Sequence, residues 1–308
     1  MGPKVAIILI NLNQEVHTRE CITSLFRVSY ANKDIILIDN CSTDGSGSRL
    51  SRDFPTVIYE PLTENLGFPG GNNRGIELAI SRGADYVLLL NNDTVVDVDF
   101  IQPLVELGES NPHVAAQCCK IFYHPDRHRL WYAGGIFNTE RAFAAHRGIH
   151  EIDSGQYDTI EDTDFASGCM LFVPSRVVQD VGVLDQALFA YYEDADWCLR
   201  AKQKGYRIVY NPRSKIWHKV STTNKIDGSF YLYFTMRNKI IMHQRYSATL
   251  KLSHILSFAS YYIRYLTRIG LWGHSWVGTK AILYGIVDGL RTQTGRNGRG
   301  RLDILLNR

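Results

Sequence analysis

The stretch Tyr86-Val87-Leu88-Leu89-Leu90-Asn91-Asn92-Asp93 decides the fold of this chain of 308 residues. Its first five residues are an unbroken apolar run, which is typical of a strand buried on both faces of a parallel sheet. The run ends abruptly in two amides and a carboxylate. Because ligands bind at the carboxyl ends of strands in open α/β sheets, Asn92 and Asp93 are candidate binding residues. An ordinary strand-end turn with a helix cap is the alternative.

Strand and helix patterns alternate around this run. Apolar runs and segments of helical character follow one another at residues 5–10, 18–26, 34–38, around 50, 56–59 and 72–81. This alternation predicts an α/β fold with a single, mostly parallel, Rossmann-like sheet flanked by helices. Beyond residue 97 the alternation fades, and we expect helical structure at 100–109 and 176–205 and a strand at 206–210.

Charge divides the chain into two expected domains, residues 1–229 and 230–308. The first holds 22 Lys and Arg against 29 Asp and Glu, a net charge of −7, whereas the second holds 12 against 2, a net charge of +10. We expect the second domain to be a helical, basic extension.

The extension has an amphipathic pattern. Apolar residues recur at helical spacing: Leu252, Ile255, Leu256, Ala259, Ile263 and Leu266. Basic residues lie opposite this stripe or continue the charge beyond it: Lys251, His254, Arg264, Arg268, Arg291, Arg296, Arg299 and Arg301. The pattern favours peripheral contact with an anionic membrane, and a dimer or core contact is the alternative.

Several classes of protein are disfavoured. The six cysteines lack the spacing of a disulfide framework or a zinc site, and no uncharged apolar stretch approaches the roughly 20 residues of a membrane span. No leader precedes the first strand, so we expect a cytoplasmic protein. Asn11-Leu12-Asn13-Gln14 follows that strand in place of a G-x-G-x-x-G motif, no Walker-type loop is present, and the basic tail has no nucleic-acid-reading module.

Three further positions carry candidate functional side chains. Asp39 follows the run 34–38, where a carboxylate can reach a base or ribose edge, although the Ser/Thr/Asp residues after it also suit a turn. The stretch Tyr191-Tyr192-Glu193-Asp194-Ala195-Asp196-Trp197 places three carboxylates among aromatic rings. A helix N-terminus favours one or two such acids, and rings beside acids suit a sugar. His218 follows an apolar strand, although a lone histidine is more often structural.

Together these residues resemble a family-2 inverting glycosyltransferase, in its rhamnosyltransferase-like branch, over about residues 4–245. The matching stretches stand in the family's order: Ile8-Leu9-Ile10-Asn11-Leu12-Asn13, Ile38-Asp39-Asn40-Cys41-Ser42-Thr43-Asp44-Gly45-Ser46, Asn65-Leu66-Gly67-Phe68-Pro69-Gly70-Gly71-Asn72-Asn73-Arg74-Gly75, Leu90-Asn91-Asn92-Asp93, Tyr192-Glu193-Asp194-Ala195-Asp196 and Trp217-His218. The resemblance implies a glycosyltransferase A-type fold and a nucleotide-sugar-binding, catalytic domain at residues 1–229.

The resemblance also implies where the donor and a divalent cation, Mn²⁺ or Mg²⁺, would bind. Asp39 would read the pyrimidine base, Asn92 would lie by the ribose, and Asp93 would be the carboxylate of the metal-binding motif. Asn92 stands where an acidic residue is commoner, so a second ligand is needed, and His218 is assigned to it.

Two more residues are assigned to the donor site from the matched stretches. They are Asn11, at the end of the first strand, and Arg74, in the segment after the Gly-rich run. For Arg74, a solvated helix charge is the alternative.

The implied reaction needs a base, because an acceptor hydroxyl with a pKa of about 15 is a poor nucleophile. Asp194 is our predicted base. Glu193 and Asp196 would orient the acceptor, and Tyr192 or Trp197 would stack on a sugar ring. A helix N-terminus lowers the basicity of a carboxylate, so Asp194 must gain from desolvation or from its acidic neighbours.

The resulting hypothesis is inverting transfer of a sugar, best matched by rhamnose from dTDP-rhamnose, to a surface polysaccharide or a lipid-linked glycan at the inner face of the cell membrane. One alternative is a UDP-sugar donor carrying glucose, galactose or N-acetylhexosamine. Others are nucleotidyl transfer, which the lack of a Gly-rich activating loop near residue 15 disfavours, and a non-catalytic glycan-assembly scaffold.

Overall fold

The structure, a computed structural model, describes residues 2–220, 228–247, 254, 257, 260 and 276–291. The chain divides into two compact units. Unit 1 comprises Met1–Ile136, Ala145–Asp185 and Asp194–Val220, and unit 2 comprises Phe137–Ala144, Gln186–Glu193 and Ser221–Arg308. Unit 2 therefore includes two short segments that precede residue 230. A functional boundary between residues 229 and 230 stays a prediction.

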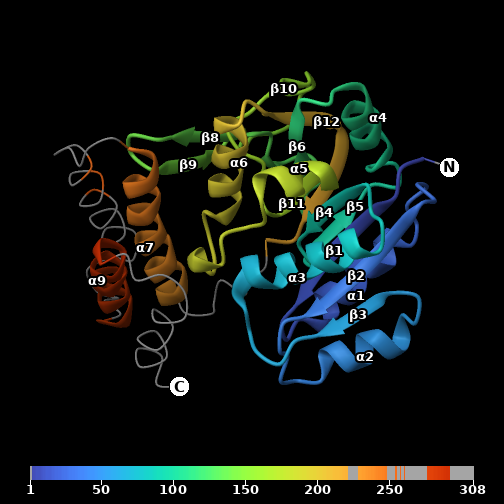
Figure 1. Cartoon of the computed structure of the whole chain (residues 1–308), viewed down its shortest axis with the longest axis horizontal. Helices are drawn as coiled ribbons and strands as arrows, with labels where there is room; N and C mark the ends of the chain where they lie inside the picture. The colour runs from blue at the N-terminus through green and yellow to red at the C-terminus, as the bar shows by residue number, and fades with distance from the viewer. Residues whose placement is uncertain are drawn as a thin grey trace. The chain divides into compact units, whose positions relative to one another are not determined.

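Unit 1 is built on one large sheet (Figure 1). Its strands lie in the order β10-β12-β6-β11-β4-β1-β2-β3, with β5 paired to β12 and β7 paired to β6. Their bounds are β1 Val5–Asn11, β2 Lys33–Asp39, β3 Ile58–Pro61, β4 Tyr86–Leu90, β5 Thr94–Val96, β6 Val114–Tyr123, β7 Leu130–Tyr132, β10 Glu161–Asp162, β11 Met170–Pro174 and β12 Arg207–His218. β3, β2, β1 and β4 are parallel, and β11 runs antiparallel to β4 and β6. The expected α/β fold is confirmed.

Helices connect these strands: α1 Glu15–Leu25, α2 Ser46–Asp53, α3 Gly67–Ser81, α4 Gln102–Ser110, α5 Ser175–Val181 and α6 Glu193–Gln203. β8 (Gly135–Asn138) and β9 (Phe143–His146) form a separate two-stranded sheet. Every residue of β4 is buried, as its apolar run predicts. α3 packs closely on β1, because a Cβ on Gly75 would lie 2.4 Å from the Ile8 side chain. All six cysteines are free thiols.

Three boundaries differ from those expected. α3 begins at Gly67, inside the Gly-rich run, because Asn40 Nδ2 donates to Gly67 O (3.1 Å) and fixes the start of the helix. The expected helical stretch 176–205 is interrupted after α5 at Gly182, which has a φ of 90°. The strand expected at 206–210 continues to His218, because it pairs with β6 and then with β5.

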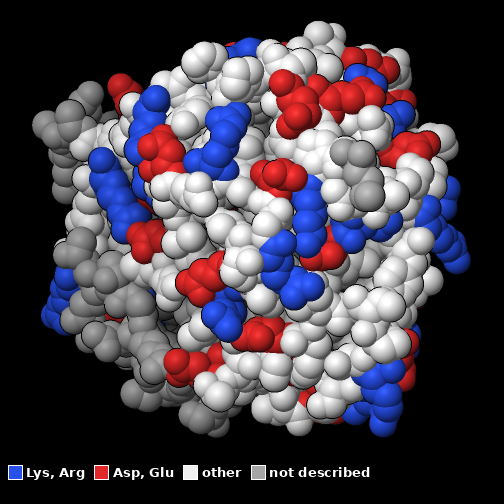
Figure 2. Space-filling view, turned by 45° about the vertical axis from the view of Figure 1, so that its right-hand side comes forward, with Lys and Arg blue, Asp and Glu red and all other residues white. Residues whose placement is uncertain are grey.

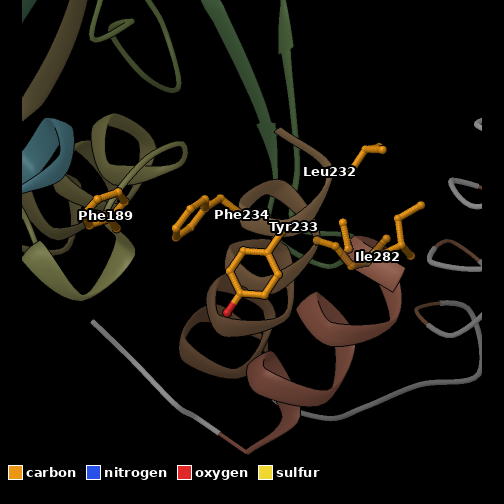
Figure 3. Packing of buried hydrophobic residues seen from close by; sticks show 7 residues of the cluster. Phe189, Leu232, Tyr233, Phe234 and Ile282 are labelled. Carbon is orange, nitrogen blue, oxygen red and sulfur yellow. The ribbon is translucent and has the colours of Figure 1, made fainter. Parts of the chain in front are cut away.

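In unit 2 the structure describes two long helices, α7 (Gly228–Tyr246) and α9 (Trp276–Leu290). Figure 3 shows their buried apolar cluster, in which the cluster members are Phe189, Leu232, Tyr233, Phe234, Met236, Ala281 and Ile282. Phe189 comes from the segment Gln186–Glu193, and its ring stacks on Phe234 with ring centroids 5.2 Å apart. The cluster therefore ties that segment to α7.

The apolar stripe expected between residues 252 and 266 lies outside the described residues, and so does most of its basic face. His254 is described, and it is buried with its ring 3.8 Å from that of His243 between centroids. This residue, which the sequence places among the basic residues opposite the stripe, is therefore buried against another side chain. Within the described ranges, no helix has the length and apolar character that a membrane span requires.

Candidate functional site

Buried side-chain hydrogen bonds join the carboxyl ends of β1, β2 and β4. Asn92, which follows β4, donates from Nδ2 to Thr18 Oγ1 (2.8 Å). The Thr18 hydroxyl in turn lies within donor distance of Asn11 Oδ1 (2.9 Å) and of Gln14 O (2.9 Å). Asn11 Nδ2 donates in turn to Asp39 Oδ1 (3.2 Å), the residue opposite it in register. The structure therefore connects three residues that are predicted to bind the sugar donor. The connection runs through Thr18, which the sequence analysis identifies only as the first residue of an expected helix.

Hydroxyl groups hold the almost fully buried carboxylate of Asp39. Its Oδ1 accepts a hydrogen bond from Ser42, and its Oδ2 accepts one from the Tyr59 hydroxyl (3.3 Å). The first turn of α2 approaches closely, because a Cβ on Gly47 would lie 2.1 Å from Asp39 Oδ2. The contact with Ser42 is of the kind expected if Asp39 only begins a turn, which is the alternative given above. The same contact also fixes the carboxylate at the edge of the sheet.

Replacing Thr18 by valine should destabilise unit 1 by about 2 kcal/mol, because Asn11 Oδ1 loses its donor and Asn92 Nδ2 loses its acceptor. Urea denaturation followed by circular dichroism measures the change. Thr23→Val is the matched control, because Thr23 lies on the exposed face of the same helix and its hydroxyl donates to Arg19 O, its one hydrogen-bond partner among the described residues. Equal losses in the two variants would contradict the importance of the buried network.

Asp93 and His218 are far apart in sequence but adjacent in the structure. β5 pairs with the end of β12 so that His218 lies opposite Thr94, and His218 Nε2 is 3.0 Å from Asp93 Oδ1. Both side chains are about nine-tenths buried. The indole of Trp131 packs edge-to-face with the His218 ring, with centroids 4.5 Å apart. Trp131 belongs to none of the motifs read from the sequence.

The Asp93–His218 pair fits a divalent cation. With bonds of about 2.1 Å, neighbouring ligands of an octahedral ion lie about 3 Å apart, which is the observed separation of the two atoms. Nδ1 of His218 forms no hydrogen bond within the described part of the chain. No group of three or more His, Cys, Asp or Glu side chains suited to a metal occurs among the described residues.

Asp194 lies in the first turn of α6 and is held by two backbone amides. Gly168 N–H donates to its Oδ2 (2.8 Å), and Ala195 N–H donates to its Oδ1 (2.7 Å). Burial raises the pKa of Asp194 above its ordinary value of 3.8, and these amide hydrogen bonds oppose the rise. Desolvation thus outweighs the helix N-terminus, which is the condition that a catalytic base here must meet.

Asp196 and Trp197, which are expected to meet the acceptor, are both buried. Asp196 Oδ2 accepts a hydrogen bond from Arg200 Nε (3.0 Å), and Trp197 Nε1 donates to Gly182 O (2.7 Å). Arg200 also donates to Val181 O (3.0 Å). These side chains face inward and fix α6 to the turn after α5, and their expected contact with an acceptor stays a prediction.

Glu193 and Tyr192 belong to unit 2. Glu193 is buried, and the partly buried Tyr192 donates from its hydroxyl to Ala142 O (3.2 Å). Their expected contact with an acceptor stays a prediction. Arg74 is exposed and paired with Glu60 (2.6 Å) and Glu77 (3.4 Å), as the alternative of a solvated helix charge describes. Its assignment to the donor site is therefore not supported by its position.

Comparison with known proteins identifies a family and a shared fold. Residues 6–172, more than half of the chain, match the model of the family described as "Glycosyl transferase family 2". The chain is 22% identical to the low-salt glycan biosynthesis hexosyltransferase Agl10 of Haloferax volcanii, over 77% of this chain and 74% of that protein. It is also 22% identical to the dTDP-rhamnosyl transferase RfbF of Shigella flexneri, over 82% and 84% of the two chains.

A solved structure shares the fold. The mannosyltransferase PcManGT from Pyrobaculum calidifontis, in complex with GDP-Man and Mn²⁺, superposes with a TM-score of 0.57 at 13% identity, over 94% of this chain and 88% of that one. The strand order, the side chains gathered at the carboxyl ends of β1, β2 and β4, and the family match lead to one conclusion. The chain belongs to glycosyl transferase family 2.

Proposed function

We propose that this chain transfers a sugar with inversion from a nucleoside diphosphate donor to a hydroxyl of a surface-polysaccharide or lipid-linked glycan acceptor. The observation that carries the proposal is the Asp93–His218 pair, 3.0 Å apart beside the buried network that leads to Asp39. The name of RfbF supports dTDP-rhamnose as the donor.

Each side chain has a part in the proposed reaction. Asp39 accepts a hydrogen bond from the pyrimidine base, and Asn92 lies by the ribose. Asp93 Oδ1 and His218 Nε2 would hold Mn²⁺ or Mg²⁺, which when bound neutralises charge on the departing diphosphate. Asp194 accepts the proton of the acceptor hydroxyl as that oxygen attacks the anomeric carbon opposite the diphosphate, so no covalent enzyme intermediate is needed.

The experiment is a donor panel. Thermal shifts should be measured with dTDP, UDP and GDP and with the corresponding nucleotide sugars, with and without Mn²⁺, because a ligand at 100 times its dissociation constant stabilises by about 2.7 kcal/mol. Nucleoside diphosphate release should follow for each donor that binds. Stabilisation by dTDP-rhamnose supports the proposal. Stabilisation by a UDP-sugar alone would mean that the donor is that UDP-sugar and not dTDP-rhamnose. Binding without release would favour a scaffold.

We also propose that residues 230–308 bring the enzyme to an anionic membrane, because their net charge is +10. On the described part of the face in Figure 2, basic and acidic side chains are interspersed. A chain ending near residue 247 should bind nucleotide but fail to sediment with anionic liposomes at low salt, whereas the full chain should sediment. Failure of the full chain to do so would leave the extension as a protein contact.

A further inference from the structure

The segment from Ala187 to Tyr192 in unit 2 has a strained backbone. Phe189, Tyr191 and Tyr192 have positive φ angles of 62°, 68° and 71°. Outside glycine, such conformations cost of order 1–3 kcal/mol each and persist only where the surroundings determine them. Something in unit 2 must therefore hold this segment.

Two neighbouring side chains of α7 supply the hold. Arg237 Nη2 donates to the carbonyl oxygens of Ala187 (2.6 Å) and Leu188 (2.9 Å). Asn238 Nδ2 lies within donor distance of three carbonyl oxygens, those of Leu188 (2.9 Å), Ala190 (2.7 Å) and Tyr191 (2.8 Å). The side chains of α7 therefore bind the carbonyl oxygens of four of the five residues from 187 to 191.

Both side chains are fully buried, so these hydrogen bonds are made where water cannot replace them. Arg237 Nε donates to Asn238 Oδ1 (2.9 Å), which links the two side chains. The guanidinium also lies over the ring of Phe234 at 4.9 Å, and Phe189 stacks on the same ring. Burying a guanidinium destabilises the fold unless its N–H groups are paired. The hydrogen bonds to the segment supply this pairing, so the buried position of Arg237 depends on the segment.

We propose that Arg237 and Asn238 are positioning residues: they hold the segment 187–192 in its strained form and so fix Glu193, the residue of unit 2 that follows it, for the transfer step. The segment leads directly into Glu193, the first residue of α6, and then into the proposed base. The link to transfer rests on the function proposed above. The hold on the segment itself rests only on the contacts within unit 2.

The test compares variants of the full chain. Asn238→Asp keeps the shape of the side chain but presents an acceptor to three carbonyl oxygens. Arg237→Lys keeps the positive charge but loses the guanidinium that donates to two carbonyl oxygens. This variant tests the hold on the segment if Asn238→Asp does not fold. Thr235→Val is the matched control, because Thr235 is a buried residue of α7 whose hydroxyl forms no hydrogen bond within the described residues.

Amide hydrogen exchange over residues 187–193 should be at least tenfold faster in Asn238→Asp and unchanged in Thr235→Val. With the donor found by the panel, kcat should fall about 10- to 100-fold while the donor KM stays within threefold, because small misplacements of a reacting group have effects of this size. Unchanged exchange in Asn238→Asp, or an equal increase in exchange in Thr235→Val, would overturn the hold on the segment.

Faster exchange with a normal kcat would overturn the link to transfer. An inactive wild-type chain that binds no donor would overturn the proposed function and that link together. Hydrogen exchange would still decide whether Arg237 and Asn238 hold the segment, so the two failures can be told apart.

Discussion

Asp194→Asn should lower turnover by a factor of roughly 10²–10⁴, which is the usual contribution of a positioned base, while donor affinity changes by less than about threefold. The amide cannot accept the proton of the acceptor hydroxyl. It retains one acceptor oxygen for the two amides, Gly168 N–H and Ala195 N–H, that hold the carboxylate. Nucleoside diphosphate release gives turnover, and calorimetry gives donor affinity.

The pH dependence gives a second measure of the same residue. A base works in its deprotonated form, so turnover should rise with pH through the pKa of Asp194. Because burial raises this pKa, the rise should lie above pH 3.8, and the residual activity of Asp194→Asn should lack it. Asp180→Asn is the control, since Asp180 is an exposed carboxylate paired with Lys204. Normal turnover in Asp194→Asn would transfer the role of base to Glu193 or Asp196.

Asp93→Ala should weaken donor binding and turnover together and lower kcat/KM at least 100-fold. Asp93 is the only carboxylate of its motif, since Asn92 precedes it, and the loss of charge neutralisation at a diphosphate is worth several kcal/mol. Added Mn²⁺ should restore only part of the loss, because a ligand is missing. Calorimetry with and without Mn²⁺ gives a readout that is independent of turnover.

His218→Ala should resemble Asp93→Ala, because Nε2 of His218 lies 3.0 Å from Asp93 Oδ1. His150→Ala is the matched control: this exposed histidine of unit 1 stacks on Tyr123. A His218→Ala enzyme whose donor binding still responds to Mn²⁺ as the wild type does would remove His218 from the proposed cation site.

The parallel half of the sheet was predictable because each strand carries its own local signal. The apolar runs that form β1, β2 and β4 are buried, as their composition predicts. The polar residues Asn11, Asp39 and Asn92 could be picked out because each stands at or just beyond the end of one of these strands. The ends of α3 and α5 were less predictable. They depend on Asn40 bonding to Gly67 O and on the positive φ of Gly182.

The site was predictable only in part, for a related reason. A motif states which residue types occur, but it does not state which way they face. Asp196 and Trp197 stand in the acidic and aromatic stretch, yet α6 turns both inward, toward Arg200 and Gly182 O. Thr18 and Trp131 belong to no motif, yet one joins the strand ends and the other packs on His218.

The sequence by itself determined the α/β class, the family resemblance and the polar residues at the strand ends, because these depend on periodicity and on short contiguous motifs. Only the tertiary structure decided that His218 meets Asp93, that burial raises the pKa of Asp194, and that Arg237 and Asn238 hold the segment 187–192. Each of these depends on strand pairing or helix packing between residues far apart in the chain. Their partners and their burial exist only once the chain has folded.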